Sequence, residues 1–152
     1  MRLVIQRVSR AEVRVGEEAV GSIGRGAVVL AGIADGDTPA IIARIADKLL
    51  GLRYFPDASG RTNLDLAEAG GELLVISQFT LLADLRRGRR PSFGQAAAPE
   101  VAATLLDLFV KRLKAAGIVV ATGRFGESMS VELVNDGPFT LTLDSETDLP
   151  SG

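Results

Sequence analysis

Histidine and cysteine are both absent from this chain. Without thiols it can form no disulfide and carry out no thiolate chemistry, and a zinc ion would need carboxylates alone, which is unusual. Any chemistry must therefore come from backbone groups, hydroxyls, carboxylates, Lys and Arg, or the substrate itself. We expect neither a cofactor nor a metal.

Long apolar runs and a strong net charge are also missing. The longest apolar stretch, residues 27–34 with Gly32 inside it, is too short to cross a bilayer, and the first residues form no signal segment. A net charge of −2 and a pI near 5.2 create no global attraction for nucleic acid, although they are compatible with a local basic patch. We expect a folded cytoplasmic domain, with no membrane and no DNA as partners.

Apolar periodicity predicts many short strands and two amphipathic helices. The main strands are expected at residues 3–8, 11–15, 19–23, 27–33, 72–78, 118–122, 129–134 and 139–143, with a short additional one at 53–55. Thr38 as N-cap and Pro39 at the first position open a helix with an apolar face of Ile41, Ile42, Ile45, Leu49 and Leu52. The second helix is expected from Pro99 to about Ala116, with a buried stripe of Val101, Leu105, Leu108, Phe109 and Leu113.

These elements predict an α+β fold, with residues 1–143 as a single domain. We expect mainly antiparallel β-sheets of seven or eight strands, with the two helices on one face in an α/β/β layering. Two helices cover so many strands only thinly, so we expect a second copy to bury the exposed sheet face in a homodimer. The acidic segment 144–152 is expected to be a mobile tail.

The run Ser77-Gln78-Phe79-Thr80 ends a predicted strand with an abrupt change from apolar to hydroxyl and amide side chains. In a structural interpretation, Ser77 and Thr80 bond to the local backbone where the strand stops, and Phe79 belongs to the core. In a functional one, exposed backbone N–H groups and hydroxyls hold and polarise a carbonyl group. Composition alone favours the structural interpretation.

The run Asn135-Asp136-Gly137-Pro138-Phe139-Thr140 lies between two alternating apolar segments and is typical of a tight hairpin turn. If the Gly137–Pro138 bond were cis, both of its carbonyl groups would instead point the same way and form a rigid polar wall. The local residues do not decide between these two outcomes.

Two further groups have an RNA-binding interpretation. A basic loop contains Arg86, Arg87, Arg89 and Arg90. Such runs are usually solvated and mobile, but arginine in a chain with only three lysines suits bidentate phosphate contacts. Phe125 and Met129 are most simply core residues, or else they stack on a base beside an opening.

Taken in order, these segments resemble the D-aminoacyl-tRNA deacylase family, also called the D-tyrosyl-tRNA deacylase family. The matching motifs are IQRV (5–8), GRGAVVLAGI (24–33), SQFTL (77–81), RPSF (90–93), TGRFG (122–126) and NDGPFT (135–140). SQFTL paired with NDGPxT is far more specific than either motif alone. Phe139 departs from the smaller residue expected there, and the segment after Leu143 extends past the usual end of the family.

The resemblance implies a homodimeric enzyme that hydrolyses the ester between a D-amino acid and the 3′ end of tRNA. Ser77 to Thr80 would form the catalytic segment. Gly137–Pro138 would be cis and reach into the partner's site, flanked by Asn135 and Thr140, and would exclude an L side chain. Glycine has no side chain to reject and would also be accepted.

Catalysis would then rest on backbone N–H groups near Phe79 and Thr80 that stabilise the oxyanion, with a ribose hydroxyl helping to activate water. We favour this route over a covalent Thr80 nucleophile, because the chain has no histidine to activate that hydroxyl. Two other classes stay open: a non-catalytic RNA-binding dimeric module, and a small-molecule esterase using Ser77, which lacks a G-x-S-x-G elbow.

Overall fold

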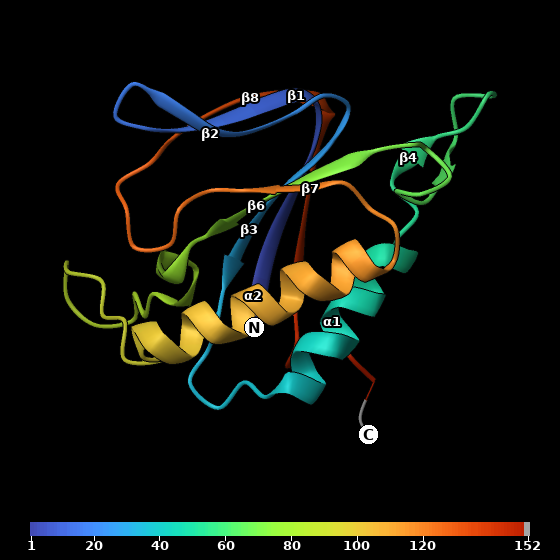
Figure 1. Cartoon of the computed structure of the whole chain (residues 1–152). Helices are drawn as coiled ribbons and strands as arrows, with labels where there is room; N and C mark the ends of the chain where they lie inside the picture. Colours follow the sequence, from blue (N-terminus) through green and yellow to red (C-terminus); the bar gives the residue numbers. More distant parts are fainter. Residues whose placement is uncertain (151–152) are drawn as a thin grey trace.

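The computed structural model describes residues 1–150 as a mixed β-sheet with two helices packed against it (Figure 1). The sheet strands are β1 (Arg2–Val15), β2 (Glu18–Ile23), β3 (Gly26–Gly32), β6 (Glu72–Ser77), β7 (Val120–Thr122) and β8 (Ser130–Asp144). The helices are α1 (Pro39–Gly51) and α2 (Pro99–Ala115), and a 3₁₀ turn, η1 (Phe79–Leu82), follows β6. A small separate hairpin joins β4 (Phe55–Pro56) to β5 (Thr62–Leu64). The expected α+β class with two helices is confirmed.

The long strand β1 organises the sheet. Its first half pairs with β3 and its second half with β2, while β8 runs antiparallel along its other edge. β6 and β7 continue the sheet beyond β3 in parallel orientation, so the sheet is mixed. The two strands expected at residues 3–8 and 11–15 form this single strand, because the exposed pair Ser9 and Arg10 contains no glycine or proline to interrupt the ladder.

Both helices begin where the sequence predicts. The Thr38 side chain accepts a hydrogen bond from the Ile41 amide, which caps α1, and α2 begins at Pro99. The buried residues of α2 are Leu105, Phe109, Val110 and Leu113. Val101 and Leu108 were wrongly expected among them, since they are 50% and 40% exposed. Both side chains lie on one flank of the helix, whereas the buried face is rotated towards the opposite flank, which carries Val110.

Two clusters of buried side chains lie on opposite faces of the central strands. The larger one fills the space between sheet and helices, with Leu3, Val29 and Val75 from the strands and Ile45 and Phe109 from the helices. The smaller one consists of Val8, Ala11, Val13, Ile23, Val28, Leu74 and Ile76. It forms where β2 and the far half of β1 fold back over β3 and β6 (Figure 1), so the sheet approaches a barrel at this end.

Of the two outcomes left open for residues 135–140, the hairpin turn is wrong. β8 continues through this segment, and its two halves both pair antiparallel with β1. Between the pairs Val8–Asn135 and Gln6–Thr140, Arg7 alone lies on β1, whereas residues 136–139 lie on β8. These extra residues leave the ladder as a bulge. The turn-forming residues therefore take the chain out of the ladder and back into it, without reversing its direction.

The C-terminal segment makes several contacts up to Pro150. Arg2 Nε binds the Asp144 carboxylate at 2.7 Å, and the Ser145 amide donates to the Met1 carbonyl at 2.9 Å. Leu149 packs against the larger core cluster. Part of the expected tail, residues 151–152, lies outside the described chain, so its mobility and the domain limit near residue 143 stay predictions.

Candidate active site

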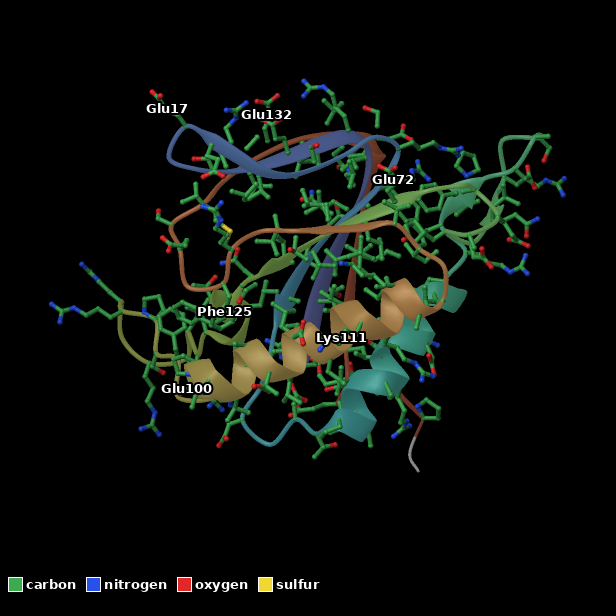
Figure 2. The ribbon with its side chains drawn as sticks, in the orientation of Figure 1. Glu17, Glu72, Glu100, Lys111, Phe125 and Glu132 are labelled. Carbon is green, nitrogen blue, oxygen red and sulfur yellow. The ribbon has the colours of Figure 1, made fainter. Side chains whose placement is uncertain are left out.

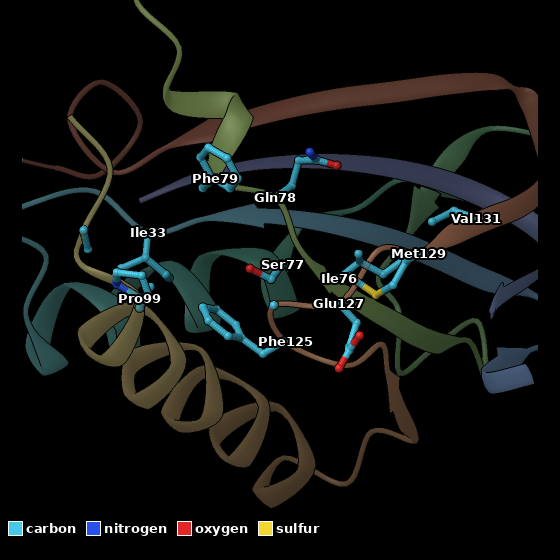
Figure 3. A pocket seen from close by; sticks show the side chains of 13 residues that line it. Ile33, Ile76, Ser77, Gln78, Phe79, Pro99, Phe125, Glu127, Met129 and Val131 are labelled. Atoms are coloured by element: carbon cyan, nitrogen blue, oxygen red, sulfur yellow. The ribbon is translucent and has the colours of Figure 1, made fainter. Parts of the chain in front are cut away.

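A cavity of 460 Å³ opens where β6 ends, beside the first turn of α2 (Figure 3). Its lining includes Ser77, Gln78 and Phe79 from the strand end, Pro99 and Ala102 from α2, and Phe125, Glu127 and Met129 from the loop before β8. The volume lies within the range of about 300–1,000 Å³ that is typical of small-ligand sites. The fold thus places Phe125 and Met129 beside Ser77, Gln78 and Phe79, from which they are far apart in the sequence.

The local backbone explains why this strand end is polar and open. Ser77 still pairs with Ala31 of β3, and the Gln78 amide donates to the Ala31 carbonyl at 2.8 Å. The chain then turns into η1, and the first N–H groups of a helical turn have no acceptor within it. Within residues 1–150 the Phe79 and Thr80 amides donate to no backbone carbonyl outside η1. They are available to bind an oxyanion.

Thr80 has a different place from the one expected for a nucleophile. It does not line the cavity, and its hydroxyl accepts a hydrogen bond from the Gln78 side-chain amide. Gln78 and Thr80 therefore form a hydrogen-bonded pair at the end of the strand. The ionisable residue on the cavity wall is Glu127, which lies near Met129 in the sequence; Glu127 was not singled out from the sequence.

Phe79 connects the cavity to the arginine loop. It is 55% exposed, and its ring meets Phe93 edge-on with centroids 5.0 Å apart. The loop is closed at its base by paired backbone hydrogen bonds between Asp84 and Ser92. Arg86 turns back and binds the Asp84 carboxylate through Nε and Nη2 at 2.9 and 2.7 Å, which lowers the pKa of Asp84 to about 2.

The other arginines of the loop point into solvent. Arg87, Arg89 and Arg90 are exposed, and within residues 1–150 they take part in no ion pair. None of the loop arginines lines the cavity. These three side chains therefore carry uncompensated positive charge on a loop that is linked to the cavity residue Phe79 through Phe93.

The Gly137–Pro138 pair lies outside this cavity, exposed on the bulge of β8. Its peptide bond is cis, and Gly137 has φ of +142°. Asn135 supports the bulge from inside, because its Nδ2 donates to the carbonyls of Arg7 at 2.8 Å and Phe139 at 3.0 Å. Thr140 closes it through Oγ1, which accepts from Gln6 Nε2 at 3.3 Å.

Arg7 is a residue of this region that the sequence did not reveal. Its side chain is buried beneath the bulge, where Nε donates to the Asp136 carbonyl at 3.0 Å and Nη1 to the Tyr54 carbonyl at 2.7 Å. The guanidinium also lies 4.6 Å from the centroid of Phe139. A signal was present, because Arg7 continues the alternation of the buried residues Leu3 and Ile5.

Within residues 1–150, no group of three or more acidic side chains has the arrangement of a metal site. No helix in this part of the chain is long and apolar enough to cross a membrane.

Comparison with known proteins gives a consistent result. The family model described as D-Tyr-tRNA(Tyr) deacylase matches residues 4–144. A D-aminoacyl-tRNA deacylase of Roseiflexus sp. (strain RS-1) is 57% identical over 145 residues, covering 95% of this chain and 94% of that protein. The enzyme of the same name from Symbiobacterium thermophilum is 55% identical over 146 residues, covering 96% and 97%.

Solved structures share the fold. One described as a "c-Myc DNA Unwinding Element Binding Protein" superposes with a TM-score of 0.90 and 37% identity, over 95% of this chain and 98% of that chain. A second, described as a probable eukaryotic D-amino acid tRNA deacylase, has a TM-score of 0.82 and 21% identity, over 93% and 97%. The resemblance carried by SQFTL and NDGPFT is confirmed, and this chain belongs to the D-Tyr-tRNA(Tyr) deacylase family.

Proposed function

We propose that this protein hydrolyses the ester that joins a D-amino acid, or glycine, to the 3′ end of tRNA. The observation that supports it most strongly is the cavity itself. Phe79, whose backbone N–H group is open, lines this cavity together with Phe125 and Met129, and the open N–H group of Thr80 follows it in the chain, in a member of a deacylase family. Such a site can polarise an ester carbonyl and hold a nucleobase, without a side-chain nucleophile.

The reaction needs little more than these groups. An aminoacyl ester is already activated, and its ribose carries a hydroxyl next to the ester oxygen. Water attacks the carbonyl carbon, the N–H groups of Phe79 and Thr80 stabilise the oxyanion, and the ester C–O bond then breaks. The ribose oxygen takes up a proton as it leaves. Ser77 and Gln78 line the reacting region, and Thr80 orients Gln78.

The nucleic-acid part of the substrate extends from the same cavity. Phe125 is 40% exposed and offers its ring to the terminal adenine, with Met129 beside it. Arg87, Arg89 and Arg90 contact the phosphate backbone of the tRNA, and Arg86 reinforces the loop through Asp84. We propose tRNA rather than DNA as the nucleic-acid partner because the family is described as a tRNA deacylase, although one solved relative is named for binding DNA.

Selectivity for the D form is proposed to come from a second copy of the chain. In its own subunit Gly137–Pro138 is exposed and lies away from the cavity. β8, however, carries Val131 on the cavity wall and Gly137 further along, so two antiparallel β8 strands related by a two-fold axis would exchange these ends. The backbone of Gly137 and Pro138 would then fill the space that an L side chain needs.

Exposed apolar side chains on β8 support the same dimer. Val131 and Val134 are 38% and 41% exposed in one copy. Burial against a second β8 would remove them from water, which favours association. We place the homodimer in the cytoplasm, where its tRNA substrate is found.

Incubation with D-tyrosyl-tRNA separates the enzyme from an RNA-binding module. We expect catalytic release of D-tyrosine, whereas a stable complex with an intact ester would identify the module. A small-molecule esterase would cleave model esters that lack RNA, and we expect no such turnover because Ser77 has no histidine partner.

Mixed dimers test the cross-subunit arrangement. One copy carries Gly137→Ala and the other an Arg substitution at Ala102 that fills its cavity. Across the two-fold axis of the mixed dimer, the open cavity of the first copy then faces the native bulge of the second, and the filled cavity of the second faces the altered bulge of the first. If the filter acts across the dimer, the open cavity keeps wild-type D-selectivity; loss of that selectivity would show that the altered bulge acts within its own subunit and contradicts a cross-subunit filter.

A further inference from the structure

A second cavity lies directly beside the candidate active site and has no part in the proposed reaction. It has a volume of 230 Å³ and runs between α2 and the segment 122–125, in front of the end of β6. Ser77 and Phe125 line both cavities. Because the two spaces meet at these residues, a ligand that extends over Phe125 enters both.

The charge of the two cavities differs. The first has the carboxylate of Glu127 on its wall, whereas Lys114 and Arg124 line the second together with Asp107. Asp107 is already balanced by Lys111, one turn along α2, at 2.7 Å (Figure 2 shows Lys111 on this helix and Phe125 on the neighbouring loop). When Asp107 is counted with Lys111 and Arg124 with Glu18, Lys114 remains as an unpaired cation among the described residues, so the second cavity favours an anion and the first does not.

Lys114 is free to engage a ligand, and Arg124 can be released from its partner to do so. Within residues 1–150, Lys114 is exposed and takes part in no ion pair. Arg124 binds Glu18 at 2.8 and 3.1 Å, but the two side chains are 50% and 63% exposed. Exposed pairs of this kind contribute little to stability, so Arg124 can exchange Glu18 for a phosphate.

The size of the second cavity indicates what it holds. Its 230 Å³ falls below the usual lower limit of about 300 Å³ for a site that binds a whole small molecule. Such a space suits one part of a longer ligand, such as a phosphate with its sugar. The first cavity, at 460 Å³, is large enough for the rest.

We propose that the second cavity receives the phosphodiester and ribose of the nucleotide that precedes the terminal adenosine, with Lys114 and Arg124 as phosphate ligands. The inference rests on the proposed function, since it requires an RNA 3′ end in the first cavity. The terminal base packs on Phe125 from one side, and the chain passes over that ring to the cationic wall. Repulsion from Glu127 keeps the phosphate on the Lys114 side.

Binding of uncleavable analogues tests this arrangement without hydrolysis. One analogue is a D-tyrosyl amide of 3′-amino-3′-deoxyadenosine, and the other is a cytidine-cytidine-adenosine trinucleotide with the same amide end. Wild type should bind the trinucleotide more tightly. Lys114→Gln should weaken trinucleotide binding about three- to tenfold and reduce its salt dependence by ~0.7 in log–log slope, as for one lost contact to a single strand. The nucleoside analogue should change less than about twofold.

Lys48→Gln is the matched control, because Lys48 is an exposed lysine in the last turn of α1 that lines neither cavity. It removes the same charge and should leave both analogues unaffected. Arg124→Gln should repeat the effect of Lys114→Gln. The proposal is overturned if the trinucleotide and the nucleoside bind equally well, or if Lys114→Gln acts no differently from Lys48→Gln. Failure to cleave D-aminoacyl esters, with the trinucleotide preference retained, would contradict the proposed function and leave this subsite standing.

Discussion

Arg7 of β1 donates a hydrogen bond from Nε to the Asp136 carbonyl oxygen at 3.0 Å, and this bond ties β1 to the bulge of β8. The same guanidinium reaches the Tyr54 carbonyl at 2.7 Å and covers Phe139. One buried side chain thus links the bulge, the strand opposite it and the segment after α1. Together with the hydrogen bonds of Asn135 to the Arg7 and Phe139 carbonyls, this link holds the bulge that carries Gly137 and Pro138.

Replacement of Arg7 by lysine should loosen the bulge. A single ammonium group cannot bind two separate carbonyls and lie flat on Phe139 as well. We expect a loss of about 1–3 kcal/mol in the free energy of unfolding, measured by urea denaturation, because a buried acceptor loses its donor. The preference for D over L substrates should fall in the same variant.

Arg10→Lys serves as the control on the same strand. Arg10 binds Glu132 at 2.7 Å, but their side chains are 59% and 68% exposed. Its substitution should change stability by less than about 0.5 kcal/mol. Equal effects at both positions would show that the link through Arg7 does not hold the bulge.

Gly137→Ala should disturb the bulge from the other side. A Cβ built there lies 2.8 Å from the Phe139 nitrogen and 3.2 Å from Arg7 Nη2, and φ is +142°. We expect a cost of about 1–3 kcal/mol in stability and slower hydrolysis of D-aminoacyl-tRNA. Gly24→Ala is the control, since nothing lies within 4 Å of its added Cβ. A Gly137→Ala protein with wild-type stability and rates would contradict this role.

Tyr54→Phe should leave stability unchanged or raise it. The ring is fully buried, and within the described residues its hydroxyl is the buried side-chain polar atom without a hydrogen-bond partner. Burial, with a smaller effect of Asp65, raises the pKa of this hydroxyl well above its usual value. Removing it should stabilise the fold by up to about 1–2 kcal/mol in urea denaturation. A loss of more than about 1 kcal/mol would instead mean that a buried water satisfies the hydroxyl.

Thr80→Ala should keep substantial single-turnover activity on D-tyrosyl-tRNA, within about tenfold of wild type, if Thr80 only orients Gln78. Thr104→Ala removes another exposed threonine, whose hydroxyl donates to the Glu100 carbonyl in α2, and should have no effect on the rate. A fall of about a thousandfold or more at Thr80, with unchanged substrate binding, would identify it as the nucleophile.

Local pattern was enough to predict some of these features and not others. The helix start at Thr38 and the polar strand end at Ser77 depend on neighbouring residues, and both were recognised. The bulge at Gly137 depends on which strand each half of β8 pairs with, which is a long-range property that turn chemistry does not encode. Arg7 was missed because a charged residue on an alternating strand is normally assigned to the solvent face.

Around the cavity, too, some residues were singled out from the sequence and others were not. The residues alone left two interpretations open for Phe125 and Met129, core packing or stacking on a base, and favoured the core, since two apolar residues in a loop carry little signal of their own. The positions of Glu127 and Lys114 on the walls of adjoining cavities could not be predicted, because only the fold brings these residues there. Charge distribution around a site is a property of the folded surface, and the net charge of the chain conceals it.

Single-turnover hydrolysis of matched D-tyrosyl-tRNA and L-tyrosyl-tRNA is the most direct test of a chirality-selective deacylase. We expect the D ester to be cleaved at least about a hundredfold faster than the L ester. Equal rates for the two esters, or a D ester that survives in the presence of excess enzyme, would contradict it.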